Sequence, residues 1–382
     1  VQYEVLKEAG YPQIKTLDQL YDILAAYYKK HPTIDGKETI AWAGFDGKEY
    51  LNNNPSMYAA GFPDHGKYLI GSDNVPRSNL TSDYIKRYYQ FLNKIYNAGM
   101  LDKEYFTVNS QGLNAKLLEG RVLAGFFPGW WIGAAEKAIR ASGHTERLYA
   151  YFPLTFDADT VSHVNTVTPT RNNWNWVITK KAKDPVRIIQ FFDYLFSDEA
   201  QKLLAWGIEG VHYEVKNGKR VVLESYQKQL NADPNIAWKE TITPFYGNSM
   251  IYGNGMKLED GDYATPVTKD SIQNSYDPMT KEVLAKYGKT VWADFLPKVE
   301  IIPANMYTLP QPEDIKAEEK RMEEVSQKES PKLVFAKNQA EFDTAWNAYK
   351  TQMEKEGLKK AEASWGALWK QYLEAYNKAV GK

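Results

Sequence analysis

The sequence contains no cysteine in 382 residues, which excludes disulfides, thiolate catalysis and thiolate metal sites. It also has no run of about eighteen apolar residues, the length that a membrane-spanning helix requires. Lysine and arginine together number 47 against 48 aspartates and glutamates, so the net charge is -1. We therefore expect no electrostatic attraction to nucleic acid or to an anionic membrane, and a neutral ligand.

The common catalytic signatures are also missing, since there is no G-x-S-x-G, no H-E-x-x-H, no P-loop and no G-x-G-x-x-G. The five histidines are scattered without the spacing of metal ligands, and we expect no metal and no cofactor. The paired carboxylates of a glycosidase leave no local signature, so a glycan hydrolase remains an alternative. Its acid and base would come from a set of loop carboxylates: Asp46, Glu49, Asp157, Asp159 and Glu209.

Aromatic residues are abundant, with 27 tyrosines, 15 phenylalanines and 11 tryptophans. Burial in a core is the commoner fate of any single tryptophan. A sugar ring, however, presents apolar C–H faces and a rim of hydroxyls, and it binds to flat aromatic faces with planar polar groups around them. Aromatic clusters that lie outside helical periodicity therefore favour a carbohydrate ligand.

The length of 382 residues favours two domains over one. Hydrophobic periodicity predicts that helices and strands alternate, as in an α/β fold. The helix 16–30 begins at the N-cap Thr16, and the helix pair 184–206 is expected to break at Ser197. The segment 46–71 is expected to be loop with at most short helices and is long enough to carry a function. The segment 209–303 has an irregular, loop-rich pattern. The remaining expected elements are helices at 82–98, 114–119, 313–330 and 342–380 and strands at 38–45 and 122–127.

Two adjacent indoles, Trp130 and Trp131, follow the expected strand 122–127 within the stretch Pro128–Gly133. Turns between elements are where a scaffold displays side chains. Adjacent positions of a regular element cannot both point into one core. At least one of the two rings is therefore expected to face a ligand, with Trp130 as the first candidate.

A polar, extended stretch at 166–173 leads into a second aromatic pattern. Trp174 and Trp176 alternate with polar or smaller residues, so that both indoles lie on one face of an expected strand. Packing in a core explains Trp174 as well as a ligand does, and it explains Trp176 better.

Trp206–Tyr213 reads WGIEGVHY and resembles a segment of the extracellular solute-binding proteins, family 1. Further stretches are similar to the family in the same order: 92–106, 118–125, 177–198 and 342–376. The resemblance implies a type II periplasmic-binding-protein-like α/β fold, in which two lobes are joined by crossing strands and a carbohydrate is held in the cleft between them. The boundaries it implies are 1–165 for the second lobe, 166–303 for the returning part of the first lobe, and 304–382 for helices that pack mainly on the second lobe.

The resemblance also implies which residues contact the ligand and which partners the protein has. Trp130 matches a place where a member of the family stacks an indole on a sugar, and further ligand contacts are expected from Trp131, Trp42, Phe45, Asp46, Arg171, Asn173 and Trp174. The implied partners are an oligosaccharide and the membrane permease of an ABC importer. The implied protein is a monomeric, non-enzymatic lipoprotein on the bacterial cell surface or in the periplasm.

Two departures from the family pattern accompany this resemblance. Val1–Pro32 resembles the start of the second lobe, so the chain is expected to lack the first-lobe opening, the signal peptide and the lipobox cysteine. Residues 32–39 read PTIDGKET and offer too few carboxylates for the six or more oxygen ligands of calcium. No calcium is expected there. A binder of peptides or other polar solutes on the same fold, and a purely structural helical adaptor, remain alternatives.

Overall fold

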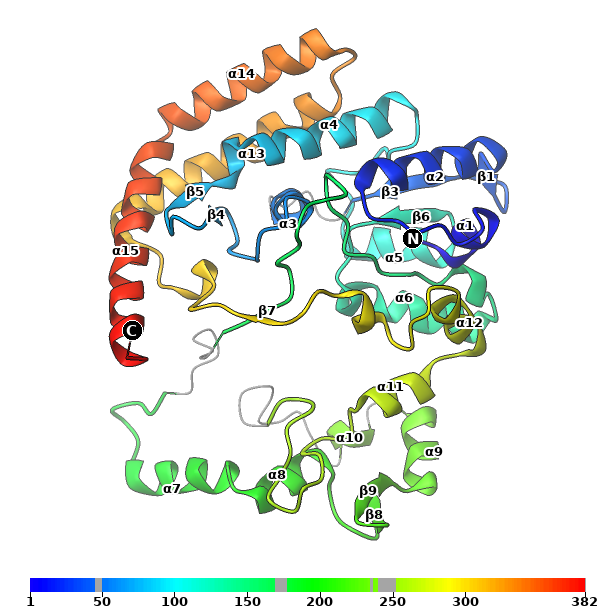
Figure 1. Cartoon of the computed structure of the whole chain (residues 1–382), viewed down its shortest axis with the longest axis vertical. Coiled ribbons are helices and arrows are strands. Elements are labelled where there is room, and N and C mark those ends of the chain that lie inside the picture. Colours follow the sequence, from blue (N-terminus) through cyan, green and yellow to red (C-terminus); the bar gives the residue numbers. More distant parts are fainter. Residues whose placement is uncertain (45–49, 169–176, 234–235, 240–251, 382) are drawn as a thin grey trace. The chain divides into compact units, whose positions relative to one another are not determined.

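A computed structural model describes residues 1–44, 50–168, 177–233, 236–239 and 252–381 (Figure 1). The chain divides into two compact units, Val1–Arg171 with Asp277–Lys382 (unit 1) and Asn172–Tyr276 (unit 2). No helix in the described ranges is long and apolar enough to cross a membrane. The lobe boundaries expected from the sequence stay a prediction.

A short parallel sheet lies in unit 1. Strands β3 (Ile40–Ala43) and β6 (Val122–Gly125) pair in parallel, with Ile40 opposite Val122 and Trp42 opposite Ala124. Parallel strands need a crossover connection, and the helices between residues 50 and 118 provide it. The other strands of unit 1 form two-residue or three-residue pairs: β1 (Thr33–Ile34) with β2 (Lys37–Glu38), β4 (Tyr68–Ile70) with β5 (Pro76–Ser78), and β7 (Thr166–Val167) with β10 (Glu300–Ile301).

Helices surround this sheet, and several begin at a side-chain cap. Thr16 and Gln19 form a capping box at the start of α2, and Ser82 caps α4. The helices of unit 1 are α1 (Tyr3–Glu8), α2 (Leu17–Lys30), α3 (Tyr50–Ala59), α4 (Asp83–Asn97), α5 (Ser110–Leu118), α6 (Gly129–Ser142), α12 (Pro278–Lys286), α13 (Lys316–Val334), α14 (Gln339–Lys355) and α15 (Leu358–Ala379). In Figure 1, α4, α13 and α14 lie side by side at the top of unit 1.

Residues far apart in the sequence meet where α4 contacts the end of α13. The Asn93 side chain donates hydrogen bonds to the carbonyl oxygens of Leu333, Val334 and Ala336 at 3.4, 2.9 and 2.7 Å. The last turn of α13 therefore has its unpaired carbonyl groups satisfied by α4. This junction joins the two stretches of chain that make up unit 1.

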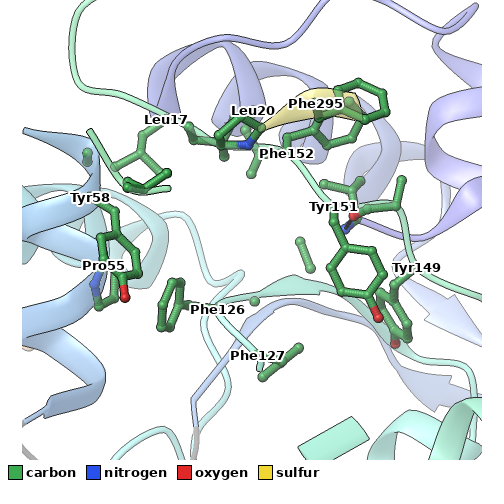
Figure 2. A pocket seen from close by; sticks show the side chains of 18 of the residues that line it. Leu17, Leu20, Pro55, Tyr58, Phe126, Phe127, Tyr149, Tyr151, Phe152 and Phe295 are labelled. Carbon is green, nitrogen blue, oxygen red and sulfur yellow. Dashed lines mark hydrogen bonds between the residues drawn. The ribbon is translucent and has the colours of Figure 1, made fainter. Parts of the chain in front are cut away.

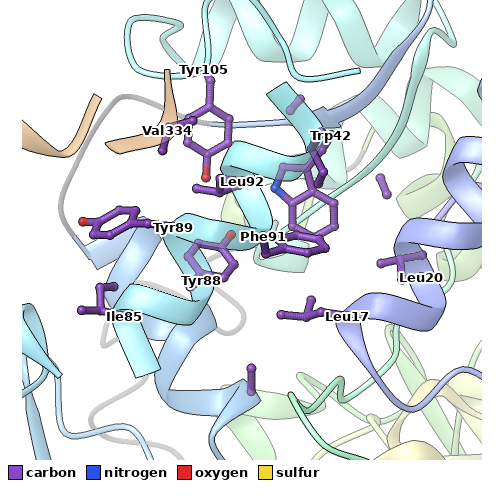
Figure 3. Close-up of a cluster of buried hydrophobic side chains, with 14 of the residues drawn as sticks. Leu17, Leu20, Trp42, Ile85, Tyr88, Tyr89, Phe91, Leu92, Tyr105 and Val334 are labelled. Atoms are coloured by element: carbon purple, nitrogen blue, oxygen red, sulfur yellow. The ribbon is translucent and has the colours of Figure 1, made fainter. Parts of the chain in front are cut away.

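One hydrophobic core extends through unit 1 (Figure 3). Trp42 of β3 is 3% exposed, and its ring meets Phe91 of α4 edge to face, with centroids 5.3 Å apart. An ion pair is buried beside this core, because the Lys116 ammonium lies 2.8 Å from both carboxylate oxygens of Asp102. Burial of such a pair is tolerated only while both partners are present.

Unit 2 is smaller, and its described residues bury fewer apolar side chains. Its elements are α7 (Pro185–Leu195), α8 (Asp198–Ala205), β8 (Tyr213–Lys216), β9 (Lys219–Val222), α9 (Glu224–Ala232), α10 (Ile236–Lys239) and α11 (Lys269–Ser275). Small clusters form around Leu195 with Leu204 and around Trp206 with Tyr213. Apolar side chains of α7, among them Val186 and Ile189, are exposed.

Several predictions about elements are confirmed and others are corrected, since the helix expected at 342–380 is two helices, α14 and α15. The Ser197 side chain caps α8 by accepting a hydrogen bond from the Ala200 amide, as the expected break at Ser197 requires. The expectation of an irregular segment at 209–303 is wrong in its described part, which contains a hairpin and several helices. The β8–β9 turn places Asn217 and Gly218 at positive φ, 52° and 74°. Asn-Gly is the residue pair that such two-residue turns favour.

Candidate functional site

The two strands of the parallel pair end at the same edge of the sheet. β3 ends at Ala43 and is followed by Gly44, whereas β6 ends at Gly125 and leads through 126–128 into α6. In α/β proteins the carboxyl ends of parallel strands are the usual place for a ligand. This topology brings Trp42 and the Trp130–Trp131 stretch to one edge.

Glycine is required at the end of both strands. A Cβ atom on Gly44 would lie 2.5 Å from the carbonyl oxygen of Tyr105. A Cβ atom on Gly125 would overlap the ring of Phe127. Any larger residue would therefore displace the backbone or the aromatic ring at the edge.

A cavity of about 510 Å³ opens beside this edge, within unit 1. In Figure 2, Tyr58 of α3 lies across the cavity from Tyr149 and Tyr151, with Phe126 and Phe127 along one side. Further apolar walls come from α2 and from the segment that contains η4 (Trp292–Phe295): Leu17, Leu20, Trp292 and Phe295. None of its described lining residues has a charged side chain. We call this space the aromatic cavity.

Tyrosine hydroxyls supply polar groups at the walls of the aromatic cavity. Tyr58 donates a hydrogen bond to Asp64 at 3.1 Å, and Tyr151 donates one to Glu136 at 3.0 Å. Burial raises the pKa of both carboxyls, and their hydrogen bonds oppose that shift. Burial also raises the pKa of both tyrosines, so their hydroxyls stay protonated and can donate. The cavity thus combines flat apolar faces with hydroxyl groups.

The predicted site residues fall into three groups. Trp42 is buried in the core and borders the aromatic cavity. Trp131 lies in the first turn of α6 and packs partly buried against the core, and the backbone of Trp130 precedes it in the same turn. Five predicted residues lie outside the described part of the chain: Phe45, Asp46, Arg171, Asn173 and Trp174. The ligand roles of all eight stay predictions.

Sequence reasoning missed most of the aromatic cavity. Phe126 and Phe127 are the last two residues of the expected strand 122–127, so their position at its end was a usable signal. Tyr58 lies on α3 within the stretch expected to be mainly loop, and Trp292 and Phe295 come from a distant part of the chain. No local pattern connects these residues, because only the tertiary fold brings them together.

Carboxylate and histidine side chains give little support to catalysis or metal binding in the described ranges. Asp157, one of the candidate acids, forms a bidentate pair with Arg87 at 2.7 and 2.8 Å. Among the residues that the structure describes, no three His, Asp or Glu side chains come together as a metal site. The buried His212 accepts a hydrogen bond from the Ile208 amide at 2.9 Å.

Comparison with known proteins identifies relatives over most of the chain. The family model described as bacterial extracellular solute-binding protein matches residues 3–202. The lipoprotein LipO of Bacillus subtilis is 22% identical over 245 residues, which cover 59% of this chain and 45% of LipO. The polygalacturonan/rhamnogalacturonan-binding protein YtcQ of the same organism is 22% identical over 70% of this chain and 50% of YtcQ. The chain thus spans about half the length of these curated relatives.

A solved structure has a similar fold over nearly all of the chain. An HMO-binding, ABC-transporter-associated solute-binding protein from Bifidobacterium longum infantis aligns with a TM-score of 0.59 and 14% identity. The alignment covers 97% of this chain and 73% of that protein. At this identity the likeness shows the fold alone, which is the type II periplasmic-binding fold with mixed helices and strands.

Proposed function

The chain belongs to the bacterial extracellular solute-binding proteins, and from this we propose that it is a receptor that captures an oligosaccharide for an ABC importer. The family consists of substrate-binding proteins and not of enzymes. The hydrolase alternative is therefore set aside. The observation that carries the proposal is the aromatic cavity at the carboxyl edge of β3 and β6.

The chemistry of the aromatic cavity supports a carbohydrate over a charged solute. Phe126, Phe127 and Tyr58 offer flat surfaces for the C–H faces of a sugar ring. The described lining side chains carry no charge that would neutralise the carboxylate and ammonium ends of a free peptide. The names of the relatives agree with this proposal, since YtcQ and the Bifidobacterium protein are described as binding polygalacturonan/rhamnogalacturonan and HMO.

Binding by such a receptor needs no chemical step. We propose that a glycan is retained because a closed state of the protein binds it more tightly than an open state does. Closure would exclude water and so strengthen hydrogen bonds to sugar hydroxyls. The proposed permease partner would recognise the closed state, and the proposed location is outside the cytoplasmic membrane, with a lipid anchor.

A thermal-shift screen followed by calorimetry tests the proposal. The purified protein is screened against di- to hexasaccharides of xylan, mannan, fructan, α-glucan and galacturonan. We expect one glycan class to raise the melting temperature, because a ligand that binds only the folded state stabilises it by mass action. No release of shorter sugars is expected on prolonged incubation.

Replacement of Trp130 by alanine tests the predicted sugar contact. We expect Trp130→Ala to weaken glycan binding by roughly tenfold or more, the effect of losing one aromatic stacking partner. Tyr96→Ala is the matched control, because Tyr96 is an exposed aromatic residue of α4 that does not line the aromatic cavity. Unchanged glycan affinity in Trp130→Ala would remove Trp130 from the site. A screen in which no glycan raises the melting temperature would overturn the proposed receptor.

A further inference from the structure

A second cavity of about 510 Å³ lies in unit 1, and α3 contributes to the walls of both cavities. Pro55 and Tyr58 of α3 line the aromatic cavity, whereas Asn54 lines the second one. The residues that determine the chemistry of the second cavity are two carboxylates, a histidine and three aromatic side chains: Asp64, Glu319, His65, Tyr68, Tyr307 and Trp365.

Both carboxylates of the second cavity accept hydrogen bonds from neutral groups. Glu319 accepts from the Tyr68 hydroxyl at 2.9 Å, from the Trp365 indole at 2.6 Å and from the Gln311 amide at 2.6 Å. Asp64 accepts from the Gly66 backbone amide at 2.9 Å and from the Tyr58 hydroxyl at 3.1 Å. These donors orient the two carboxylates but do not neutralise their charge.

No described basic side chain forms an ion pair with either carboxylate. Lys67 also lines the second cavity, but its ammonium lies 3.9 Å from Glu323, a different carboxylate. His65 is 4% exposed, and burial lowers its pKa to about 4, so it is neutral near pH 7. Asp64 and Glu319 are both half-buried. A carboxylate that is partly removed from water without a cation is unfavourable, and a cationic ligand would relieve that cost.

Three aromatic side chains line the second cavity: Tyr68, Tyr307 and Trp365. Tyr68 and Trp365 lie with ring centroids 5.6 Å apart. Tyr307 is 52% exposed, and its hydroxyl accepts a hydrogen bond from the Asn305 amide at 2.8 Å. Gly66 has a φ of +73°, and a Cβ atom there would lie 3.3 Å from Tyr307. Aromatic faces next to carboxylates are the usual surroundings of a bound ammonium group.

We propose that the second cavity binds the protonated amine of an amino sugar, held by Asp64 and Glu319 and flanked by Tyr307 and Trp365. This inference rests on the proposed function and narrows its ligand to glycans that contain a basic unit. The Tyr58 hydroxyl links the two cavities, since Tyr58 lines the aromatic cavity and bonds to Asp64 in the second.

The test compares two tetrasaccharides of the same linkage, β-1,4-linked glucosamine and its fully N-acetylated form, by calorimetry at a pH where the amines are protonated. We expect the aminated form to bind roughly tenfold tighter, as charge-assisted hydrogen bonds and cation–π contacts imply. The preference is expected to shrink as salt is raised. Asp64→Asn and Glu319→Gln should each abolish it, whereas Glu324→Gln should retain it, because Glu324 is exposed on α13 and does not line the second cavity.

The results of this test distinguish failure of the amino-sugar site from failure of the proposed function. Binding of a neutral glycan without any preference for the aminated form would overturn the amino-sugar site and leave the receptor intact. A preference that persists in Asp64→Asn and in Glu319→Gln, with both variants folded by thermal melting, would also overturn it. Competition by tetramethylammonium with no binding of glucosamine tetrasaccharide would show a small-cation site instead. Failure to bind any glycan would overturn the proposed function itself.

Discussion

Units 1 and 2 contain similar kinds of helices but bury them to different degrees. In unit 1 the apolar faces of α2, α4 and α13 meet in one continuous core. In unit 2 the helix α7 has an apolar stripe, yet Val186 and Ile189 are exposed. The same amphipathic pattern thus predicts a helix in both units but not its contribution to stability, which depends on what the apolar face contacts.

The largest expected difference between the units comes from matched lysine variants. Lys116 is buried with Asp102, whereas Lys202 forms a partly exposed pair with Asp260 at 3.0 Å. We expect Lys116→Met to lower the free energy of unfolding by about 3–5 kcal/mol, because Asp102 would stay buried without its partner. We expect Lys202→Met to cost no more than about 1 kcal/mol. Urea denaturation measures both, and equal losses would contradict the comparison.

A second pair of variants, at one leucine in each unit, tests the same difference in burial. Leu92 of α4 is 0% exposed, and Leu203 of α8 is 48% exposed. Leu92→Ala is expected to cost about 2–5 kcal/mol, the sum of lost burial and a new cavity. Leu203→Ala should change stability by less than about 0.5 kcal/mol. A large loss in Leu203→Ala would show that unit 2 depends on the exposed side of α8.

Lowering the pH should destabilise unit 1 because of the buried His65. Its folded-state pKa of about 4 lies below that of the unfolded chain, so the unfolded state binds a proton first as pH falls. Stability should therefore decrease between about pH 6.5 and pH 4, by up to about 3 kcal/mol. His65→Gln should flatten this part of the profile, and His144→Gln, at an exposed position, should not.

The His65 comparison is made between each variant and the parent chain. Asp64 and Glu136 titrate with the opposite sign, because burial raises their pKa and protonation relieves that cost. Their contribution is common to all three proteins and cancels in the difference. An unchanged acid profile in His65→Gln would show that water reaches the ring.

The sequence predicted local features well where a single residue decides them. Thr16 and Ser197 cap helices where expected, since a cap needs only a side chain and the amide three residues later. The β8–β9 hairpin was missed although Asn217–Gly218 is a strong turn signal. Prediction was weaker for α3, a helix of 10 residues in a stretch expected to be loop with at most short helices, because its asparagines and Pro55 are typical of a loop. Tertiary contacts of Met57 and Ala59 with the core outweigh that local preference.

The same contrast between local and tertiary signals applies to the candidate site. The edge formed by β3 and β6 could be predicted, because two buried strands that each lead into a loop rich in glycine and aromatic residues suggest a binding edge. The second cavity could not, since Asp64, Tyr307, Glu319 and Trp365 share no spacing in the sequence. Their proximity follows from the packing of α15 against both β5 and α13.

The junction at Asn93 has a consequence for the order of folding. Leu333, Val334 and Ala336, whose carbonyl groups it binds, are synthesised only after all of unit 2. Until then the growing chain holds α4 without the α13 helix that covers it. Contacts between such distant residues pay a large loop-closure entropy before they stabilise anything, and they slow folding. Unit 1 is therefore the part of the protein that is completed last.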